Sequence, residues 1–104
     1  MNVRVEFVSQ GDASVRKCRV TNGDKSAEVS FVCHPCVDNT EEENRAYLAN
    51  ALSWYEIYPV WEDYARAAGC EKAEYDVHKE AYEALSGIFT AEELREFIDE
   101  EGEI

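Results

Sequence analysis

The stretch FVCHPCVDNTEEENRAY, residues 31–47, contains the point at which the periodicity of the chain changes. Before it, apolar and polar residues alternate with a period of two, which is typical of half-buried strands. After it, apolar residues recur with a period near 3.6, which is typical of amphipathic helices. Strands followed by helices predict an α+β domain.

Three strand-like segments precede this change. Asn22-Gly23 predicts a tight hairpin turn, because both residues tolerate the positive φ of a type I′ turn. The segments cover residues 3–7, 14–21 and 26–33. One face of the strands is expected to carry Cys18, Val20, Ala27, Val29, Phe31 and Cys33. We therefore expect a three-stranded antiparallel β-meander in residues 1–37.

Three to four α-helices, packed on one sheet face, are expected in residues 38–104. Thr40 with Glu43, and Thr90 with Glu93, have the spacing of capping boxes at helix starts. The last two helices are expected over residues 71–86 and 91–99.

Proline and glycine give the expected helix ends. Pro59 either kinks the first helix or occupies the first turn of a second helix that ends at Gly69. Gly87 is the expected C-cap of the following helix. The chain of 104 residues is long enough for one core, so residues 1–104 are expected to form a single domain.

The net charge of −13 is unevenly distributed. Residues 1–37 carry five basic and four acidic side chains, whereas residues 38–104 carry five basic and nineteen acidic ones. Such a negative field opposes direct binding to nucleic acid or to an anionic membrane, and it attracts basic protein surfaces. The apolar stretches are short and interrupted by charges, which argues against a membrane span.

The four cysteines are candidates for a metal site or a redox pair. Cys33 and Cys36 form a Cys-X-X-Cys. The candidates for completing a zinc site are Cys18, His34, Cys70 and His78. The expected hairpin pairs Cys18 near residue 27. Cys18 would then lie about 20 Å from Cys33 along the sheet, too far for both to bind one metal ion. The favoured interpretation has no metal and no cofactor, with Cys18 and Cys33 as small core residues. Since no basic apolar leader opens the chain, we expect a cytoplasmic protein with four reduced thiols.

Aromatic residues are concentrated in residues 54–64. Trp54, Tyr58 and Trp61 would share one helix face against the sheet if Pro59 only kinks the helix. There are more aromatic rings than one face can bury. Tyr55 or Tyr64 is therefore expected to be exposed and to anchor an interface.

Acidic residues near the end of the chain are the strongest functional signal. Glu92, Glu96 and Glu100 repeat at i, i+4, which places like charges about 6 Å apart and costs a few tenths of a kcal/mol per pair. Carboxylates at a helix C-terminus also oppose the helix dipole. The expected partner-binding carboxylates are Glu92, Glu93, Glu96, Asp99, Glu100, Glu101 and Glu103.

A small single domain with strongly acidic helices and no catalytic motif resembles phage-encoded inhibitors of bacterial defence, the anti-CRISPR proteins and anti-restriction DNA mimics. The resemblance implies that the carboxylates stand in for phosphates in the basic channel of a CRISPR effector or restriction enzyme. A non-enzymatic inhibitor is therefore expected in the host cytoplasm. The alternatives are an acidic adaptor or an oligomer formed through the aromatic helix, and a small zinc-stabilised module.

Overall fold

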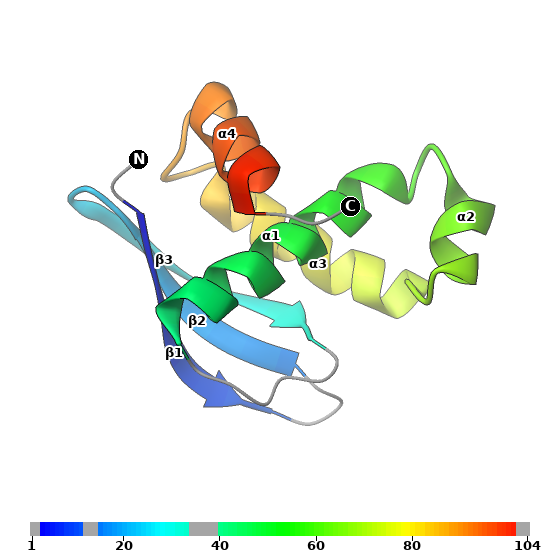
Figure 1. Cartoon of the computed structure of the whole chain (residues 1–104), viewed down its shortest axis with the longest axis horizontal. Coiled ribbons are helices and arrows are strands. Elements are labelled where there is room, and N and C mark those ends of the chain that lie inside the picture. The colour runs from blue at the N-terminus through cyan, green and yellow to red at the C-terminus, as the bar shows by residue number, and fades with distance from the viewer. Residues whose placement is uncertain (1–2, 12–14, 34–39, 102–104) are drawn as a thin grey trace.

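In the part of the chain that the structure describes, three strands are followed by four helices (Figure 1). The computed structural model describes residues 3–11, 15–33 and 40–101. The strands are β1 (Val3–Gln10), β2 (Val15–Asn22) and β3 (Lys25–Val32). The helices are α1 (Glu41–Ile57), α2 (Glu62–Ala67), α3 (Lys72–Leu85) and α4 (Ala91–Glu101). The α+β class and the order of the elements are confirmed.

The sheet is a meander in which each strand pairs antiparallel with its neighbour in the chain, in the order β1-β2-β3. The predicted alternation is confirmed, with Ala27 partly buried at the edge of the apolar face. The buried hydrophobic residues of this face are Val3, Val5, Cys18, Val20, Val29, Phe31 and Cys33. A register shift between Phe7 and Ser9 interrupts the pairing of β1 with β2.

The hairpin between β2 and β3 turns one residue later than predicted. Asn22 pairs with Lys25, so Gly23 and Asp24 form the loop, and Gly23 takes the positive φ of 65°. Asn22 stays in the strand, where its side-chain amide donates to the carbonyl oxygen of Ile88 at 2.8 Å. This contact spans 66 positions, so the local pattern of residues could not indicate it.

The later turn changes the partner of Cys18. Cys18 pairs with Val29 rather than near Ala27, so the predicted separation from Cys33 was two residues too long. Four residues along a strand still span about 13 Å. Cys18 therefore remains too far along the sheet to share a metal ion with Cys33.

Arg16 is buried on the core-facing side of β2. Its Nη1 donates to Oδ1 of buried Asn44 at 2.6 Å, and its Nε donates to Oε1 of Gln10 at 3.1 Å. The guanidinium carbon also lies 5.0 Å from the ring centroid of Phe7 and 5.7 Å from that of Tyr47. Arg16 thus connects two strands to α1 through polar and cation–π contacts.

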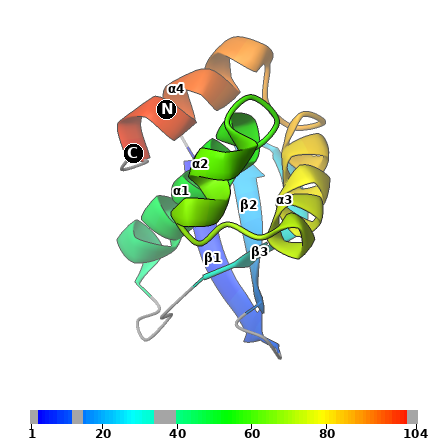
Figure 2. The same cartoon turned by 90° about the vertical axis from the view of Figure 1, so that its right-hand side faces the viewer.

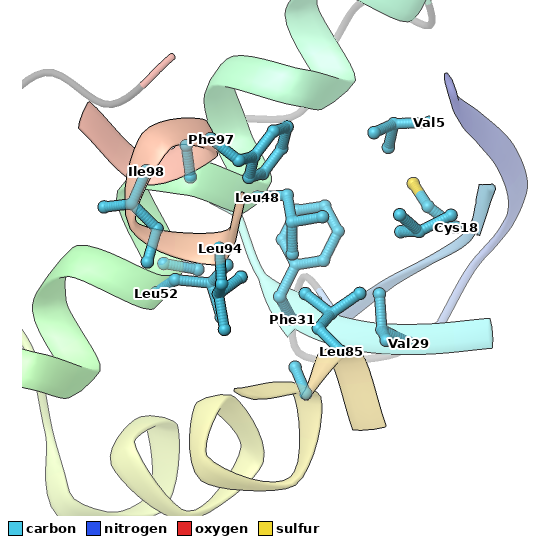
Figure 3. Close-up of a cluster of buried hydrophobic side chains, with 14 of the residues drawn as sticks. Val5, Cys18, Val29, Phe31, Leu48, Leu52, Leu85, Leu94, Phe97 and Ile98 are labelled. Carbon is cyan, nitrogen blue, oxygen red and sulfur yellow. The ribbon is translucent and has the colours of Figure 1, made fainter. Parts of the chain in front are cut away.

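Helices α1 and α3 cover the apolar face of the sheet, α1 over β1 and α3 over β3 (Figure 2). Helix α4 packs on α1. In the core, Leu94 and Phe97 of α4 lie beside Leu48 and Leu52 of α1, with Phe31 of the sheet nearby (Figure 3). Burying each such side chain contributes roughly 1.5–3 kcal/mol. No helix within the described ranges is long and apolar enough to cross a membrane.

The predicted capping box is complete at α4, whereas at α1 the Glu43 side chain bonds to the hydroxyl of Thr40 rather than to its backbone amide. The amide of Glu43 donates to Oγ1 of Thr40 at 3.2 Å, and the Thr40 hydroxyl donates to Oε1 of Glu43 at 2.9 Å. At α4, the amide of Glu93 donates to Oγ1 of Thr90 at 3.1 Å, and the Thr90 amide donates to Oε1 of Glu93 at 2.9 Å. The bonds donated by the Glu43, Thr90 and Glu93 amides satisfy donors that a helix start leaves without partners.

Pro59 lies in the turn between α1 and α2, rather than at a kink or in the first turn of the second helix. Trp61 therefore leaves the helix face that it would share with Trp54 and Tyr58. Tyr58 is buried in a small second cluster, Trp54 packs against that cluster, and Trp61 is exposed. The condition for one continuous aromatic face, a helix that Pro59 only kinks, is therefore not met, because α1 ends at Ile57 before the proline.

Glycine ends α2 but not α3. The amide of Cys70 donates to the Ala65 carbonyl at 2.8 Å, and the amide of Gly69 donates to the Arg66 carbonyl at 3.0 Å. With a φ of 96° at Gly69, this is a Schellman motif. Gly87 follows α3 without a positive φ, so the predicted glycine cap of that helix was wrong.

We expect Gly69→Ala to lower the free energy of unfolding by about 1 kcal/mol, because a Cβ disfavours this φ. No heavy atom among the described residues lies within 4 Å of the added Cβ, so the cost is conformational. Urea titration followed by circular dichroism measures it. Gly11→Ala is the matched control, since its Cβ would meet only the Val15 carbonyl at 3.5 Å. Equal losses in the two variants would refute the role of φ.

Candidate functional site

The outer face of α4 is acidic, and its inner face is apolar. Glu92, Glu96 and Glu100 are exposed. None of the three forms an ion pair with another residue that the structure describes. We refer to these three carboxylates as the α4 acidic face. The buried residues on the other side of the helix are Leu94, Phe97 and Ile98.

The other predicted carboxylates of this region are less available. Asp99 is exposed and accepts from Arg95 at 3.4 Å. Glu93 is half-buried in the capping box, where the Thr90 amide holds the pKa of its carboxyl below the usual value. Glu101 is half-buried. Glu103 lies outside the described residues.

Arg95, the basic residue of α4, does not neutralise the α4 acidic face. Arg95 is held by Glu56 of α1 and by Asp99 of its own helix. Exposed ion pairs of this kind contribute little to stability. They do orient the guanidinium toward α1 and Asp99, and thus leave the α4 acidic face with an uncompensated negative field.

The two predicted aromatic anchors have different environments. Tyr55 is half-buried between Tyr75 and Tyr82, at ring-centroid distances of 5.2 and 5.0 Å. Burial, followed by the nearby Tyr75, raises the pKa of Tyr55. Tyr64 is 59% exposed, so of the two only Tyr64 has the exposure expected of an anchor.

Tyr64 belongs to a larger exposed apolar corner that the sequence analysis did not identify. Val60 and Trp61 are 72% and 62% exposed. We call Val60, Trp61 and Tyr64 the aromatic corner. It lies where α2 projects beyond the end of α1, away from α4 (Figure 1). The structure therefore does not join the aromatic corner and the α4 acidic face in one site. The helix-ending Pro59 was the signal that could have revealed Trp61.

Three of the candidate metal ligands line one cavity. Cys33, Cys70 and His78 border a space of about 420 Å³ between α1, α3 and the end of β3. Cys36 lies outside the described residues. Among the described residues, no group of three or more His, Cys, Asp or Glu side chains has an arrangement that could hold a metal ion.

The cysteines differ from the prediction of four reduced thiols. Cys33 is disulfide-bonded, whereas Cys18 and Cys70 are free and buried. Burial raises the pKa of Cys18 to about 11, despite the opposing charge of Arg16. Burial and the nearby Glu74 likewise raise the pKa of Cys70. Both free thiols are therefore protonated at neutral pH and are poor nucleophiles.

His78 is buried on α3 with a defined hydrogen bond. Its Nε2 accepts from the backbone amide of Val32 at 3.0 Å. Burial lowers the pKa of His78 to about 4, and the hydrogen bond that Nε2 accepts requires the neutral ring. The imidazole is therefore neutral at pH 7.

Comparison of the chain with protein-family models, with curated proteins and with solved structures finds no match. A functional proposal consequently depends on the charge, exposure and contacts of the residues themselves. Of the surfaces described above, the α4 acidic face and the aromatic corner have side chains available to a partner.

Proposed function

We propose that this protein is a non-enzymatic inhibitor that binds the basic nucleic-acid-binding surface of another protein through α4. The observation that supports this proposal best is the α4 acidic face. Its three carboxylates are exposed, evenly spaced and free of ion pairs with described residues. The i, i+4 spacing places them about 6 Å apart along one helix face.

The mechanism is electrostatic and steric. Arg and Lys side chains that normally contact phosphates would contact the carboxylates of Glu92, Glu96 and Glu100. The net charge of −13 accelerates the encounter with a basic surface. The buried side chains of α4 pack the helix against α1. Little conformational entropy is therefore lost when α4 binds a partner. Nucleic acid is then excluded from the occupied groove.

The resemblance to inhibitors of bacterial defence suggests which basic proteins to test first. We propose a CRISPR effector or a restriction enzyme as the partner, with the inhibitor acting in the bacterial cytoplasm. Each like-charged i, i+4 pair destabilises the helix by a few tenths of a kcal/mol. A row of carboxylates that lowers helix stability in this way fits a role in binding.

The experiment begins with affinity capture from a nuclease-treated bacterial lysate, washed at about 0.1 M and then about 0.5 M salt. Proteins held by charge are released by the second wash because salt screens exposed charges. A released protein supports the proposal only if it binds nucleic acid and if this chain competes with that binding.

Charge reversal at Glu92, Glu96 and Glu100 to lysine is expected to weaken binding to such a partner about 30-fold, because attraction becomes repulsion. Titration of the purified partner measures the affinity, and circular dichroism confirms that the variant folds. The control reverses exposed Glu42, Glu80 and Glu83, which changes the net charge equally. We expect a loss below about threefold there. Equal affinities for both variants would exclude α4 as the binding surface.

The aromatic corner favours a second candidate, an adaptor or oligomer that uses apolar contacts. Trp and Tyr anchors often dominate the energy of protein interfaces. Binding through Trp61 and Tyr64 would persist at about 0.5 M salt, since salt screens charges and does not weaken apolar contacts. Trp61→Ser combined with Tyr64→Ser would then abolish binding, whereas the α4 reversal would leave it intact.

A further inference from the structure

The outer edge of β3 is open to a further strand. In the sheet order β1-β2-β3, this strand pairs with β2 on one side and with no other described strand on the opposite side. Its residues Lys25–Val32 pair with β2 without a register shift. The other edge, on β1, is interrupted by a register shift between Phe7 and Ser9. A regular, unpaired edge is a template for strand addition.

The register of the hairpin determines which backbone groups face this edge. Lys25 directly follows the two-residue loop, so it forms a hydrogen-bonded pair with its partner on β2. Because such pairs alternate along the ladder, the N–H and C=O groups of Glu28 and Ser30 point away from β2. Val32 has the same parity, and its amide does point outward, to Nε2 of His78. The outward backbone groups of Glu28 and Ser30 form no hydrogen bond with another described residue.

A groove lies at this open edge, where α3 packs beside β3 (Figure 2). Its volume is about 340 Å³, and residues of both β3 and α3 border it. Glu28 and Ser30 direct their side chains to the uncovered face of the sheet, whereas Val29 between them is buried on the core side. A space that borders all three residues and α3 therefore lies beside the edge of β3.

The wall that α3 contributes is apolar and made of small side chains. The residues of this wall are Val77, Ala81 and Ala84. They follow i, i+4, i+7, which is the spacing of one helix face. Ala84 is exposed and Val77 is half-buried, so apolar surface remains for the side chains of an added strand.

The charges at the groove favour a basic segment as its occupant. Glu28 and Glu80 border the groove, together with the base Lys17. Glu80 forms no ion pair with another residue that the structure describes. The net charge of −13 repels a second copy of the chain and attracts a basic peptide.

We propose that β3 and α3 bind an extended basic peptide segment of another protein as an additional, antiparallel strand of the sheet. Its hydrogen-bonded residues lie opposite Glu28 and Ser30, and their lysine or arginine side chains lie on the uncovered face beside Glu28. The residues between them place small apolar side chains against Val77 and Ala84. This site is independent of the α4 acidic face, so the two proposals succeed or fail separately.

The probe is an acetylated, amidated hexapeptide that alternates lysine with valine. Two further versions carry an N-methyl group on every lysine amide or on every valine amide. In the proposed strand the lysine amides point toward β3 and the valine amides point to solvent. We expect lysine methylation to weaken binding at least about tenfold, because two or more hydrogen bonds are lost, and valine methylation to change it less than about threefold. The peptides have equal charge, so attraction alone would bind them equally.

NMR and matched alanine substitutions locate the bound peptide. The largest ¹⁵N–¹H shifts are expected at the amides of Glu28 and Ser30. Ala84→Leu fills the groove from an exposed position on α3. Ala73 is exposed on the same helix and does not border the groove. We expect Ala84→Leu to weaken binding at least about tenfold and Ala73→Leu to leave it unchanged, with circular dichroism confirming that both variants fold.

Any of four results would overturn the proposal. The first is no binding of the unmethylated peptide at about 1 mM. The second is valine methylation that weakens binding as much as lysine methylation or more, which would exclude the proposed antiparallel strand. The third is binding that survives Ala84→Leu, which would place the peptide elsewhere. The fourth is a dimer of the free protein, seen by analytical ultracentrifugation and dissociated by Ala84→Leu, because a second copy would then occupy the edge.

Discussion

Arg16→Ala is expected to lower the free energy of unfolding by about 3 kcal/mol. The substitution removes a buried side chain that donates to Asn44 at 2.6 Å. It also removes the cation–π contacts with Phe7 and Tyr47. Truncation leaves a cavity and deprives the buried Asn44 oxygen of this donor, and both effects destabilise the folded state.

Arg19→Ala is the matched control on the same strand. Arg19 points to the uncovered face and pairs with Glu28 at 2.9 Å, with about half of each side chain exposed. Such pairs contribute roughly 0–1 kcal/mol. Urea titration followed by tryptophan fluorescence compares the two variants. Similar losses at Arg16 and Arg19 would contradict the structural role of Arg16.

Lowering the pH from 7 to 4 is expected to cost about 3 kcal/mol of stability through His78 alone. Burial lowers the pKa of this residue from 6.5 to about 4. The unfolded chain therefore binds a proton near pH 6.5, whereas the folded protein does not until about pH 4. The stabilisation is complete above pH 6.5 and is lost as the pH falls toward 4.

His78→Gln isolates this contribution. Carboxylates titrate in both proteins, so the difference between their unfolding free energies reports on residue 78. The Gln side-chain oxygen can still accept from the Val32 amide. We expect the stability advantage of the native protein to shrink between pH 6.5 and 4, as measured by urea titrations at several pH values. A pH-independent difference would mean that His78 titrates normally in the fold.

The elements that were predicted correctly depend on local signals. Thr40 with Glu43 and Thr90 with Glu93 indicate helix starts because the capping partners are three residues apart. The exposure of Glu92, Glu96 and Glu100 follows from helix periodicity in the same way. Charge and period were therefore enough to find the candidate acidic face.

The features that were missed depend on contacts between distant segments. Asn22 remains in β2 and bonds to Ile88, 66 positions away. The burial of Arg16 requires Asn44 on α1, and the tautomer of His78 requires the Val32 amide on β3. No pattern in one segment encodes these pairs. The cavity beside His78 was therefore not predicted, although Cys70 and His78 are candidate metal ligands by sequence.

The placement of the helices on one face of the sheet gives the molecule a large electric dipole moment. Among the described residues, the helical part 40–101 carries a net charge of −12, whereas the sheet part, 3–11 and 15–33, carries +2. Because the two parts form opposite sides of the fold (Figure 2), their centres of charge are well separated. A basic surface within about 10 Å, the Debye length near 0.1 M salt, exerts a torque on this dipole. The protein therefore rotates its helical side toward such a surface before the two molecules touch.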